Sequence, residues 1–533
     1  MINDIGSGPP SQSSQRVNLI TERIIIFSLV MYALFAPHSI AITQGAFLLG
    51  LAAWGVQMAA GRNFRLPRTP VDISILGFFA CCVISSFLSY DPLVSIKGLR
   101  SPAFFLAFYF VYNKVRDRRL ASFLALAIIA SCLVNVAYSA VQVGVGRGLR
   151  IDSIREDSPF ANDTIKVGDI ILEVDDQKVS SLEELSRIIE SQRGRLRIKF
   201  QRSEAVGEIT LKRKLEGDGV SWLGITTSPG RNIRVMGFYS HYETYAEVLQ
   251  LIGALAVGLL IAQPSKRSIK ALFLGSAILL IAAALIMTST RAAMAGMVVA
   301  VATMAIASSK RRAVIAALAG ILLVGPIAFV SLEHARGISV FDPEEGSTAY
   351  RLEVWREAFG LIADHPLVGI GKGSEGKLRE SLGLYDDGRL PPGHFHSTPI
   401  QIATWWGLPA LIFYFSFMAI FTVEIWKLSK RLRTERQWDL FGITLGGLGA
   451  LVAFNVSSLV HFNFGDGEVV MAFWLLTGLA FSVRQTVGEN LDKSKQEHTP
   501  APPPPDSSHK NPPRELEVAS EPSVRAARAR QNS

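Results

Sequence analysis

Five polar side chains lie beside long apolar runs of the sequence, where they could bind and transform a substrate. Arg234 precedes one apolar run, Arg291 follows another, and Arg351 begins an amphipathic stretch. His394 and His396 stand directly before a further apolar run. A guanidinium offers a planar fork of donors to phosphate oxygens, and a neutral imidazole can take a proton from a hydroxyl.

Each of these residues also has a simpler explanation. An arginine at a helix end commonly reaches toward lipid headgroups, which applies to Arg291 taken alone. A histidine near a membrane interface is more often structural than catalytic. His394 and His396 have no third ligand at a useful spacing, which argues against a metal site. The segments that position these side chains therefore decide between the interpretations.

The apolar runs have the length of membrane-spanning helices. Of the 533 residues, 49% are hydrophobic and 19% are charged, and the charged residues are bunched between the runs. A run of about 20 residues crosses the hydrocarbon core as a helix, which satisfies its own backbone hydrogen bonds. We therefore predict an all-α polytopic membrane protein of about twelve transmembrane helices, with one small inserted α+β domain. The predicted helices cover residues 20–37, 40–60, 71–89, 101–113, 120–142, 242–262, 271–289, 293–308, 313–331, 403–427, 439–459 and 467–484.

Basic residues fall in alternate loops between these runs, and this sets the orientation. Loops rich in Lys and Arg stay in the cytoplasm. Both termini are then cytoplasmic, and the loops 143–241 and 332–402 face the outside of a bacterial inner membrane. All five candidate residues fall on that outer side. The basic loops contain Arg62, Arg65 and Arg68; Lys114, Arg116, Arg118 and Arg119; Lys266, Arg267 and Lys270; Lys310, Arg311 and Arg312; and Lys427, Lys430, Arg431, Arg433 and Arg436.

Composition excludes several other classes of protein. The net charge is +9, but the basic residues are spread over loops instead of gathering on one face, which argues against nucleic acid as a partner. Cys81, Cys82 and Cys132 lie inside apolar runs and offer neither a disulfide framework nor a zinc spacing. The polar stretch 485–533, with its proline run Pro502–Pro505, predicts a disordered cytoplasmic tail.

Residues 148–214 interrupt the membrane pattern with dense charges of both signs and short alternating segments. The stretch 165–175 predicts a turn and a strand, 179–190 a helix, and 196–201 and 208–213 two more strands. The apolar face of the predicted helix contains Leu182, Leu185, Ile188 and Ile189.

This block resembles a PDZ domain of the bacterial type. The resemblance rests on Ser158-Pro-Phe-Ala161, Lys166-Val-Gly-Asp-Ile-Ile-Leu-Glu-Val174 and Leu223-Gly-Ile225. PDZ domains bind extended peptides or C-termini by strand addition, with a backbone loop holding the carboxylate. The candidate for that loop is Gly146–Ile151, which departs from the usual apolar-Gly-apolar form. A peptide or protein ligand and a folded spacer without a ligand both remain open.

The membrane half resembles the O-antigen ligase family, which includes polymerases and protein O-oligosaccharyltransferases. The family's His-polar-x9-Gly motif is matched by His396-Ser397, nine residues to Trp406, and then Gly407, with Ala410 where a second Gly is usual. The family's Ser-Arg segment is matched by Ser289-Thr-Arg291. Its Arg…Trp…Pro-Leu-x-Gly-x-Gly loop is matched by Arg351, Trp355, Pro366, Leu367, Gly369 and Gly371.

The resemblance implies a metal-independent membrane glycosyltransferase that needs no nucleotide or other cofactor. The donor would be a polyprenyl-diphosphate-linked glycan, and the acceptor a hydroxyl of lipid A-core or of a growing glycan. His396, Arg291 and Arg351 would be catalytic, with Arg234 and His394 as additional substrate-binding residues. Cations suit a diphosphate leaving group, and a neutral histidine suits proton removal from the attacking hydroxyl.

Three alternatives compete with this interpretation. A polymerase of O-antigen or exopolysaccharide would need the same cations and base as a ligase. A membrane protease, a class that often carries PDZ domains, is disfavoured because neither His-Glu-x-x-His nor Gly-x-Ser-x-Gly occurs. A transporter or flippase is less expected because the predicted helix interiors contain almost no Asp or Glu.

The predicted domain organisation follows from these segments. Residues 1–145 form N-terminal transmembrane helices, and 146–227 form the PDZ-like domain on the outer side. Residues 228–484 form a ligase-like transmembrane core with the large outer loop 332–402, and 485–533 form the tail.

Overall fold

The computed structural model describes residues 12–60, 68–146, 148–160, 165–191, 194–202, 205–212, 223–230, 234–309, 346–387 and 393–497, together with Ile315 and Gly320. The chain divides into two compact units, Met1–Thr486 and Val487–Ser533. The helices, the sheet and the pocket described below all belong to the first unit, apart from the end of the last helix.

Among the described residues, ten segments are long and apolar enough to cross a membrane. Together with the small antiparallel sheet of the inserted domain, they confirm a polytopic all-α membrane protein with an inserted α+β domain. The spanning helices are α1 (Gln12–Phe35), α2 (Ile40–Ala60), α6 (Arg118–Val145), α8 (Tyr242–Ala262), α9 (Ile269–Met287), α10 (Arg291–Ser308), α15 (Thr398–Thr434), α16 (Trp438–Ser457) and α17 (Gly467–Glu497), and the tenth segment is Pro92–Lys114.

Three predicted helices differ from the structure or lie outside it. The run predicted over 71–89 is α3 (Asp72–Phe87), which is apolar but shorter than the ten spanning segments. The run predicted over 101–113 is part of a broken segment made of α4 (Pro92–Gly98), η1 (Pro102–Phe105) and α5 (Leu106–Lys114). Proline lacks a backbone N–H, so Pro102 starts a new helical piece. The run predicted over 313–331 lies outside the described residues except for Ile315 and Gly320.

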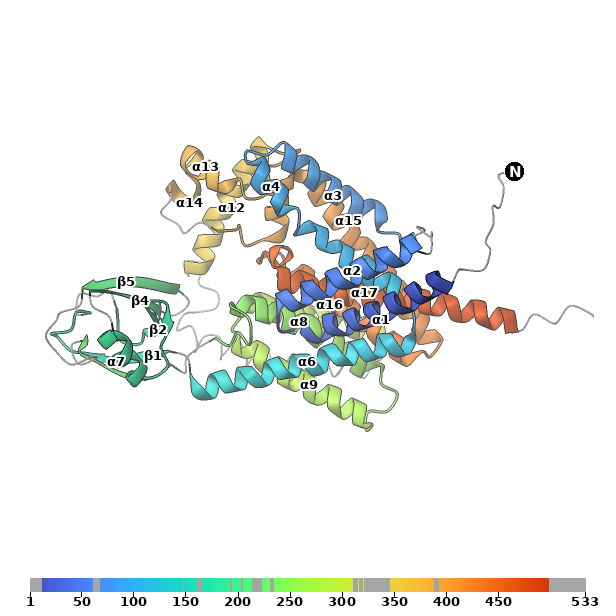
Figure 1. The fold of residues 1–533 in the computed structure, drawn as a ribbon, viewed down its shortest axis with the longest axis horizontal. Coiled ribbons are helices and arrows are strands. Elements are labelled where there is room, and N and C mark those ends of the chain that lie inside the picture. The colour runs from blue at the N-terminus through green and yellow to red at the C-terminus, as the bar shows by residue number, and fades with distance from the viewer. Residues whose placement is uncertain are drawn as a thin grey trace, which may run out of the picture. The chain divides into compact units, whose positions relative to one another are not determined.

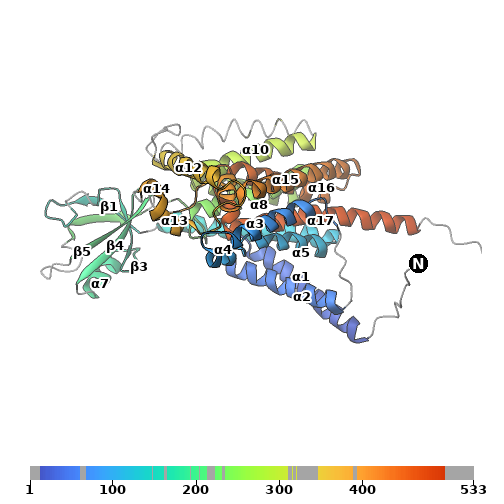
Figure 2. The same cartoon turned by 90° about the horizontal axis from the view of Figure 1, so that it is seen from above.

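Helices α8, α16 and α17 form the interior of the bundle. In each of them, 83% of the apolar window is buried inside the protein, against 33% for α1, α2 and α9. Helix α8 packs against α16, α9 and α10, and Figure 2 shows α8, α15, α16 and α17 running beside one another. A Cβ on Gly258 of α8 would lie 2.3 Å from the backbone of Gly446 in α16, so these two helices pack backbone to backbone. Such small-residue contacts are typical of membrane helix packing.

Helix α15 is broken in its first half. Gly407 has φ 82° and ψ 170°, and Pro409 follows two residues later. The break leaves backbone carbonyls without N–H donors from the helix itself. A loop from outside the helix supplies these donors. Ile370 N–H donates to Thr404 O (2.9 Å), and Gly371 N–H donates to Trp405 O (2.9 Å).

The glycines of this junction have no space for side chains. A Cβ on Gly407 would lie 2.3 Å from Leu367 O, and one on Gly369 would lie 2.5 Å from Thr404 O. Gly369 and Gly407 also have positive φ, which favours glycine. The Pro-Leu-x-Gly-x-Gly loop and the Gly407 turn, 36 or more residues apart in sequence, are therefore two halves of one backbone joint.

The inserted domain is an antiparallel sheet with one helix (Figure 1). Its strand order is β5-β4-β2-β1-β6, and β3 pairs with β2. The elements are β1 (Leu149–Ile154), β2 (Ile170–Val174), β3 (Gln177–Lys178), α7 (Leu182–Ser191), β4 (Arg195–Arg202), β5 (Ala205–Lys212) and β6 (Ile225–Pro229). Leu185, Ile188 and Ile189 of α7 are buried as predicted, but Leu182 is 48% exposed because it is the first residue of the helix.

The sheet argues against Gly146–Ile151 as a carboxylate-binding loop. Residues 149 and 150 lie in β1, which pairs with β2 on one side and with β6 on the other, so its backbone groups are already used. Strand β6 pairs with β1 alone among the described strands, which leaves it an edge for strand addition. It follows the buried Leu223 and Gly224 (φ 60°), so the apolar-Gly-apolar sequence 223–225 leads directly into β6.

The remaining described elements surround the end of the bundle where α8, α15 and α17 begin and α16 ends. They are α12 (Gly346–Asp364), α13 (Glu375–Leu382), α14 (Leu384–Asp387) and η3 (Asn463–Gly465). The opposite ends of α8 and α15 lead into the loops with Lys266, Arg267 and Arg436. The basic loops after α8 and α15 and the elements around α12 therefore lie at opposite ends of these helices.

Candidate functional site

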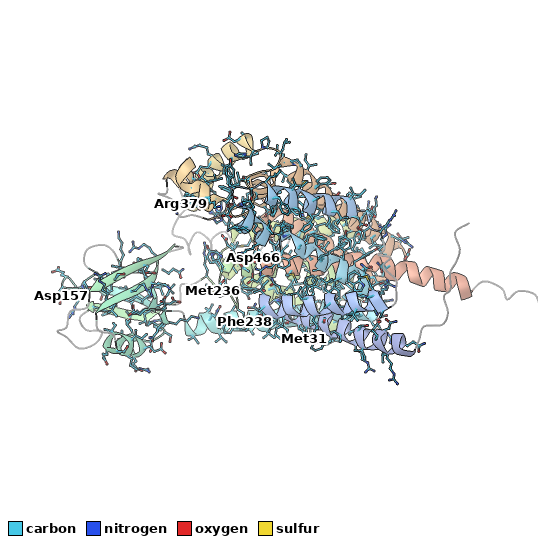
Figure 3. The ribbon with its side chains drawn as sticks, turned by 45° about the horizontal axis from the view of Figure 1, so that its top comes forward. Met31, Asp157, Met236, Phe238, Arg379 and Asp466 are labelled. Atoms are coloured by element: carbon cyan, nitrogen blue, oxygen red, sulfur yellow. The ribbon has the colours of Figure 1, made fainter. Side chains whose placement is uncertain are left out.

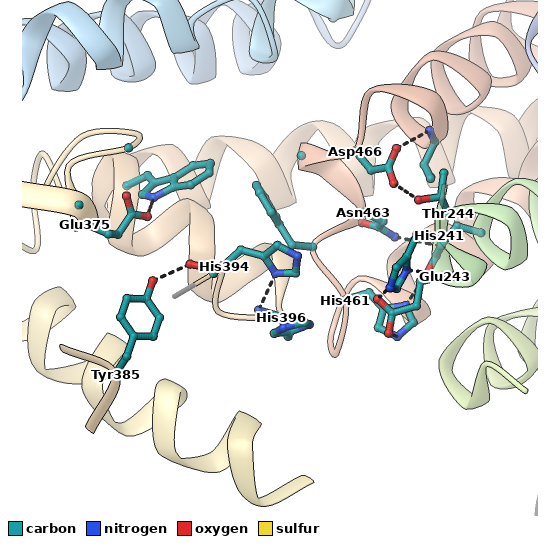
Figure 4. Close-up of a pocket in the computed structure, with 18 of the residues that line it drawn as sticks. His241, Glu243, Thr244, Glu375, Tyr385, His394, His396, His461, Asn463 and Asp466 are labelled. Carbon is teal, nitrogen blue, oxygen red and sulfur yellow. Dashed lines mark hydrogen bonds and ion pairs between the residues drawn. The ribbon is translucent and has the colours of Figure 1, made fainter. Parts of the chain in front are cut away.

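A cavity of about 700 Å³ opens among these helix ends. Its wall combines the start of α8, the turn and helix of 373–379, the loop before α15, and the segment between α16 and α17 (Figure 4). Arg379 and Asp466, which lie on this wall, are labelled in Figure 3. The ionisable and aromatic lining residues are His241, Glu243, Glu247, Glu375, Arg379, Tyr385, His394, His396, Trp405, His461, Phe462 and Asp466.

The loop that carries His394 and His396 is fixed through its backbone. Trp355 Nε1 of α12 donates to Phe395 O (2.7 Å), and Phe395 N–H donates to Gln401 Oε1 (2.7 Å). Tyr385 OH donates to Gly393 O at 2.5 Å. Phe395 itself is fully buried. The tryptophan of the sequence motif thus positions the histidine loop.

His396 adopts a backbone conformation that is uncommon for a residue with a side chain. Its φ is +47°, in the left-handed region, where strain is tolerated when the surroundings over-determine the fold. Its backbone N–H donates to His394 Nδ1 (3.2 Å), and its ring meets Tyr350 edge-on at 5.6 Å between centroids. Nδ1 of His396 is buried without a hydrogen-bond partner in the described part of the chain.

Electrostatics keep His396 neutral. Burial, followed by the neighbouring His394, lowers the pKa of His396 to about 3, although Glu243 opposes the change. Burial also lowers the pKa of His394. Both imidazoles are therefore uncharged near neutral pH, and His396 has a ring nitrogen available to accept a proton.

A second, charged group lies on the other side of the cavity, around His461. His461 Nδ1 lies 2.8 Å from Glu247 Oε1, and His461 Nε2 lies 3.6 Å from Glu243 Oε1. The same Glu243 oxygen lies 3.9 Å from Arg351 Nη2. Glu243 therefore lies between an imidazole and a guanidinium.

Glu247 is held more firmly than Glu243. Ser457 Oγ donates to Glu247 Oε2 (2.8 Å), and Gln250 Nε2 donates to the same oxygen. Burial alone would lower the pKa of His461, but its hydrogen bond to Glu247 and the charge of Glu243 outweigh burial and raise it. His461 therefore favours its charged form more than His394 and His396 do.

Glu375 lies at the far end of the cavity, beyond His394 (Figure 4). Its Oε1 accepts hydrogen bonds from Gln401 Nε2 (3.2 Å) and from Trp405 Nε1. Burial raises the pKa of this carboxyl group. Because Gln401 also accepts from Phe395, Glu375 supports the histidine loop from behind.

The structure brings the five predicted residues to one end of the bundle, at different distances from the cavity. His394 and His396 line the cavity, and Arg351 reaches it through Glu243. Arg234 stacks over Tyr242, the first residue of α8, with 4.4 Å from its guanidinium carbon to the ring centroid. Arg291 is the first residue of α10 and is not a lining residue of the cavity.

The sequence interpretation missed the residues that form the charged group. Glu243 and Glu247 lie inside the run predicted over 242–262, so the statement that helix interiors contain almost no Asp or Glu was wrong for this helix. Two carboxylates four residues apart, followed by Gln250, are the available signal, because that spacing places them on one helix face. His461 lies 214 residues from Glu247 and had no local pattern that could connect the two.

The cavity offers no recognisable metal site. Within the described ranges, no group of three His, Cys, Asp or Glu side chains is arranged to hold a metal ion.

The fold and the cavity define a multi-pass membrane protein with a polar site at one end of its helices and an inserted antiparallel-sheet domain. Residues 248–415 match the family model described as O-antigen ligase, and residues 150–202 match the model described as PDZ domain. No curated protein matches the chain. Residues 248–415 are thus similar to an O-antigen ligase domain, and the inserted domain before them is similar to a PDZ domain. The described helices indicate a multi-pass membrane protein, and the ligase match supports the ligation or polymerisation of glycans in general. The matched ligase segment contains His396 and Arg351 but ends before His461 and begins after Glu247.

Proposed function

We propose that this protein transfers a glycan from a polyprenyl-diphosphate carrier to a hydroxyl acceptor at the outer face of the inner membrane. One observation carries the proposal. A neutral His396, whose Nδ1 is buried without a hydrogen-bond partner among the described residues, lines a cavity of about 700 Å³ in a segment that matches the O-antigen ligase family. That histidine is suited to take a proton from an acceptor hydroxyl.

The reaction breaks one bond and forms one bond at the same carbon. The acceptor hydroxyl attacks the anomeric carbon, the bond from that carbon to the diphosphate oxygen breaks, and the polyprenyl diphosphate leaves with the electron pair. The hydroxyl proton moves to His396. The new glycosidic bond replaces the old one, so no redox partner or nucleotide is consumed.

The arginines stabilise the leaving group. Negative charge accumulates on the diphosphate as the glycosidic bond breaks, so a fixed guanidinium lowers the energy of the transition state more than that of the bound donor. Arg351 lies 3.9 Å from Glu243, which lines the cavity, and Arg291 begins α10 at the same end of the bundle. A bound diphosphate also counteracts the effects that lower the pKa of His396, and this makes it a better base when donor is present.

A ligase and a polymerase differ in the acceptor, and both fit this cavity. Lipid A-core as acceptor makes the protein a ligase, and a growing glycan makes it a polymerase. We propose the ligase reaction as the main activity and a peptide or protein ligand at the β6 edge of the PDZ domain. The unpaired backbone edge of β6 supports that ligand.

Purified full-length protein in lipid vesicles tests the proposal. The vesicles contain polyprenyl-diphosphate-linked glycan and lipid A-core, and products are separated on glycolipid gels. A single transferred product on lipid A-core is expected. A ladder of glycan lengths on the polyprenyl carrier would instead establish the polymerase reaction, and no change in the donor would reject glycosyl transfer.

A further inference from the structure

The charged group around His461 contains a carboxylate in a position suited to an anionic substrate. Glu243 Oε1 lies 3.6 Å from His461 Nε2 and 3.9 Å from Arg351 Nη2. Glu243 lines the cavity, and its side chain is 23% exposed. Two cations close together in a low-dielectric site repel each other unless an anion lies between them.

We propose that Glu243 and the donor diphosphate compete for the same position between Arg351 and His461, and that the diphosphate displaces Glu243 to bind both cations. His461 is then a second cation for the substrate, which neither the family's matched segment nor the sequence motif includes. This inference rests on the proposed function, since it names residues that bind the proposed donor.

The contrast between the two glutamates supports displacement of one of them. Glu247 makes short hydrogen bonds to His461 and to Ser457, 2.8 Å each, so it remains in place and orients the imidazole. The contacts of Glu243 are longer than hydrogen bonds and have the length of loose ion pairs. A ligand with two or more negative charges can replace such contacts at a lower cost than it can replace those of Glu247.

Glu243 has a second partner to which it can move. Its other carboxylate oxygen, Oε2, lies 3.9 Å from Nδ1 of His241, whose side chain is 51% exposed. Both residues lie at the N-terminus of α8, where His241 is the N-cap and Glu243 falls in the first turn. Because the partial positive charge of a helix N-terminus favours anions, this end stabilises the displaced carboxylate and the arriving phosphate alike.

Binding of polyprenyl diphosphate to the full-length protein, measured at equilibrium without acceptor, tests this inference apart from catalysis. Glu243→Gln removes the competing negative charge, so we expect the dissociation constant to fall by about threefold to tenfold. His461→Gln removes the second cation, so we expect it to rise by on the order of tenfold. Glu353→Gln is the matched control, because Glu353 pairs with Arg356 at 2.8 Å on the same helix as Arg351 and does not line the cavity.

The pH dependence of wild-type binding gives a second readout, which does not require that the His461→Gln protein folds. The pKa of His461 is raised, so the imidazole is charged below that value and the affinity should fall as pH rises through it. Titration of the diphosphate itself would act in the opposite direction, since the ligand gains negative charge. The charged and titratable groups around His461 are Glu243 and Glu247 of α8, His241 before α8, Arg351 of α12, His394 and His396 of the loop before α15, and Asp466 before α17.

The outcomes separate the two proposals. If Glu243→Gln binds polyprenyl diphosphate as wild type does or more weakly, displacement of Glu243 by the donor is wrong. If wild-type affinity does not fall with rising pH in the range where the diphosphate is already fully ionised, His461 is not the second cation. If wild-type protein does not bind polyprenyl diphosphate at all, the proposed donor is wrong and this inference falls with it. Tighter binding by Glu243→Gln, with Glu353→Gln unchanged, supports the exchange.

Discussion

The two sides of the cavity hold their histidines in opposite ways. On one side, the side chains of Trp355 and Tyr385 donate hydrogen bonds to backbone carbonyls of the loop around His396, and burial keeps that ring neutral. On the other side, charged side chains fix His461, and Glu247 raises its pKa. When two titratable groups have surroundings that shift their pKa values in opposite directions, the two groups are suited to different roles in one reaction. Under the proposed function, this difference favours His396 for proton removal and the side of His461 for anion binding.

The two sides can act in one reaction only if both face the same compartment. The membrane topology therefore gives the prediction with the largest effect, because each reporter fusion should read either fully cytoplasmic or fully periplasmic. Reporter fusions after Arg119, Arg312 and Arg436 should read cytoplasmic, because basic loops stay inside. Fusions after Lys214 and Gly383 should read periplasmic. A cytoplasmic signal after Gly383 would place the cavity on the wrong side for a lipid-linked donor at the outer face.

The largest quantitative effect is expected at the neutral histidine. His396→Ala removes the proton acceptor, and the transfer rate should fall by about 10²–10⁴-fold, the usual contribution of a general base. His38→Ala is the matched control, because burial also lowers the pKa of His38, which hydrogen-bonds Ser131 outside the cavity. Rates are compared in membranes at equal protein levels. Equal rates for the two variants would remove His396 as the base.

A somewhat smaller effect is expected for the arginine that connects the two sides. Arg351→Ala should lower the transfer rate by on the order of 10²–10³-fold, as for loss of one donor to a developing anion. Arg351→Lys should recover only part of that loss, because an ammonium lacks the planar fork. Arg291→Ala should cost a similar factor if Arg291 also contacts the diphosphate. Near-normal rates for both alanine variants would exclude an arginine-bound diphosphate.

The smallest effect on the transfer rate is expected for Trp355, which holds the histidine loop through Phe395 and not through the base itself. Trp355→Phe keeps the aromatic ring but removes the hydrogen bond to Phe395 O, so His396 becomes less well positioned. We expect kcat to fall by about tenfold, in line with one hydrogen bond, and KM for the donor to stay nearly constant. Trp426→Phe in the remote half of α15 serves as the control. A change in donor KM without a change in kcat would mean that Trp355 shapes the binding cavity and does not position the base.

The membrane-spanning helices could be predicted from the sequence because each one is specified by its own apolar run, independently of distant residues. Apolar runs of sufficient length, such as Ile269–Met287, lose backbone hydrogen bonds to water and must form helices whatever their neighbours are. The histidine loop was also predicted, since His396 and Gly407 belong to one short motif. Glu247 and His461 could not be paired in this way, because their contact depends on the packing of α8 against α16.

The break in α15 was visible only in part. Gly407 and Pro409 stand together in the sequence, yet the predicted helix began at residue 403 and crossed them without interruption. The structure shows the helix starting at Thr398, with Gly407 non-helical inside it. What no local pattern revealed is that residues 366–371 supply the missing hydrogen-bond donors.

That joint has a consequence for how the protein matures in the membrane. Until Ile370 and Gly371 dock, the carbonyls of Thr404 and Trp405 would stand unpaired in a lipid environment, at a cost of several kcal/mol for each group. The docking segment precedes α15 in the chain, so a ribosome delivers it before the helix that needs it. The first turns of α15, which lead out of the histidine loop, therefore reach their final form only after the preceding loop has docked against them. A newly made chain gains the geometry of the histidine loop and the stability of this helix in the same folding step.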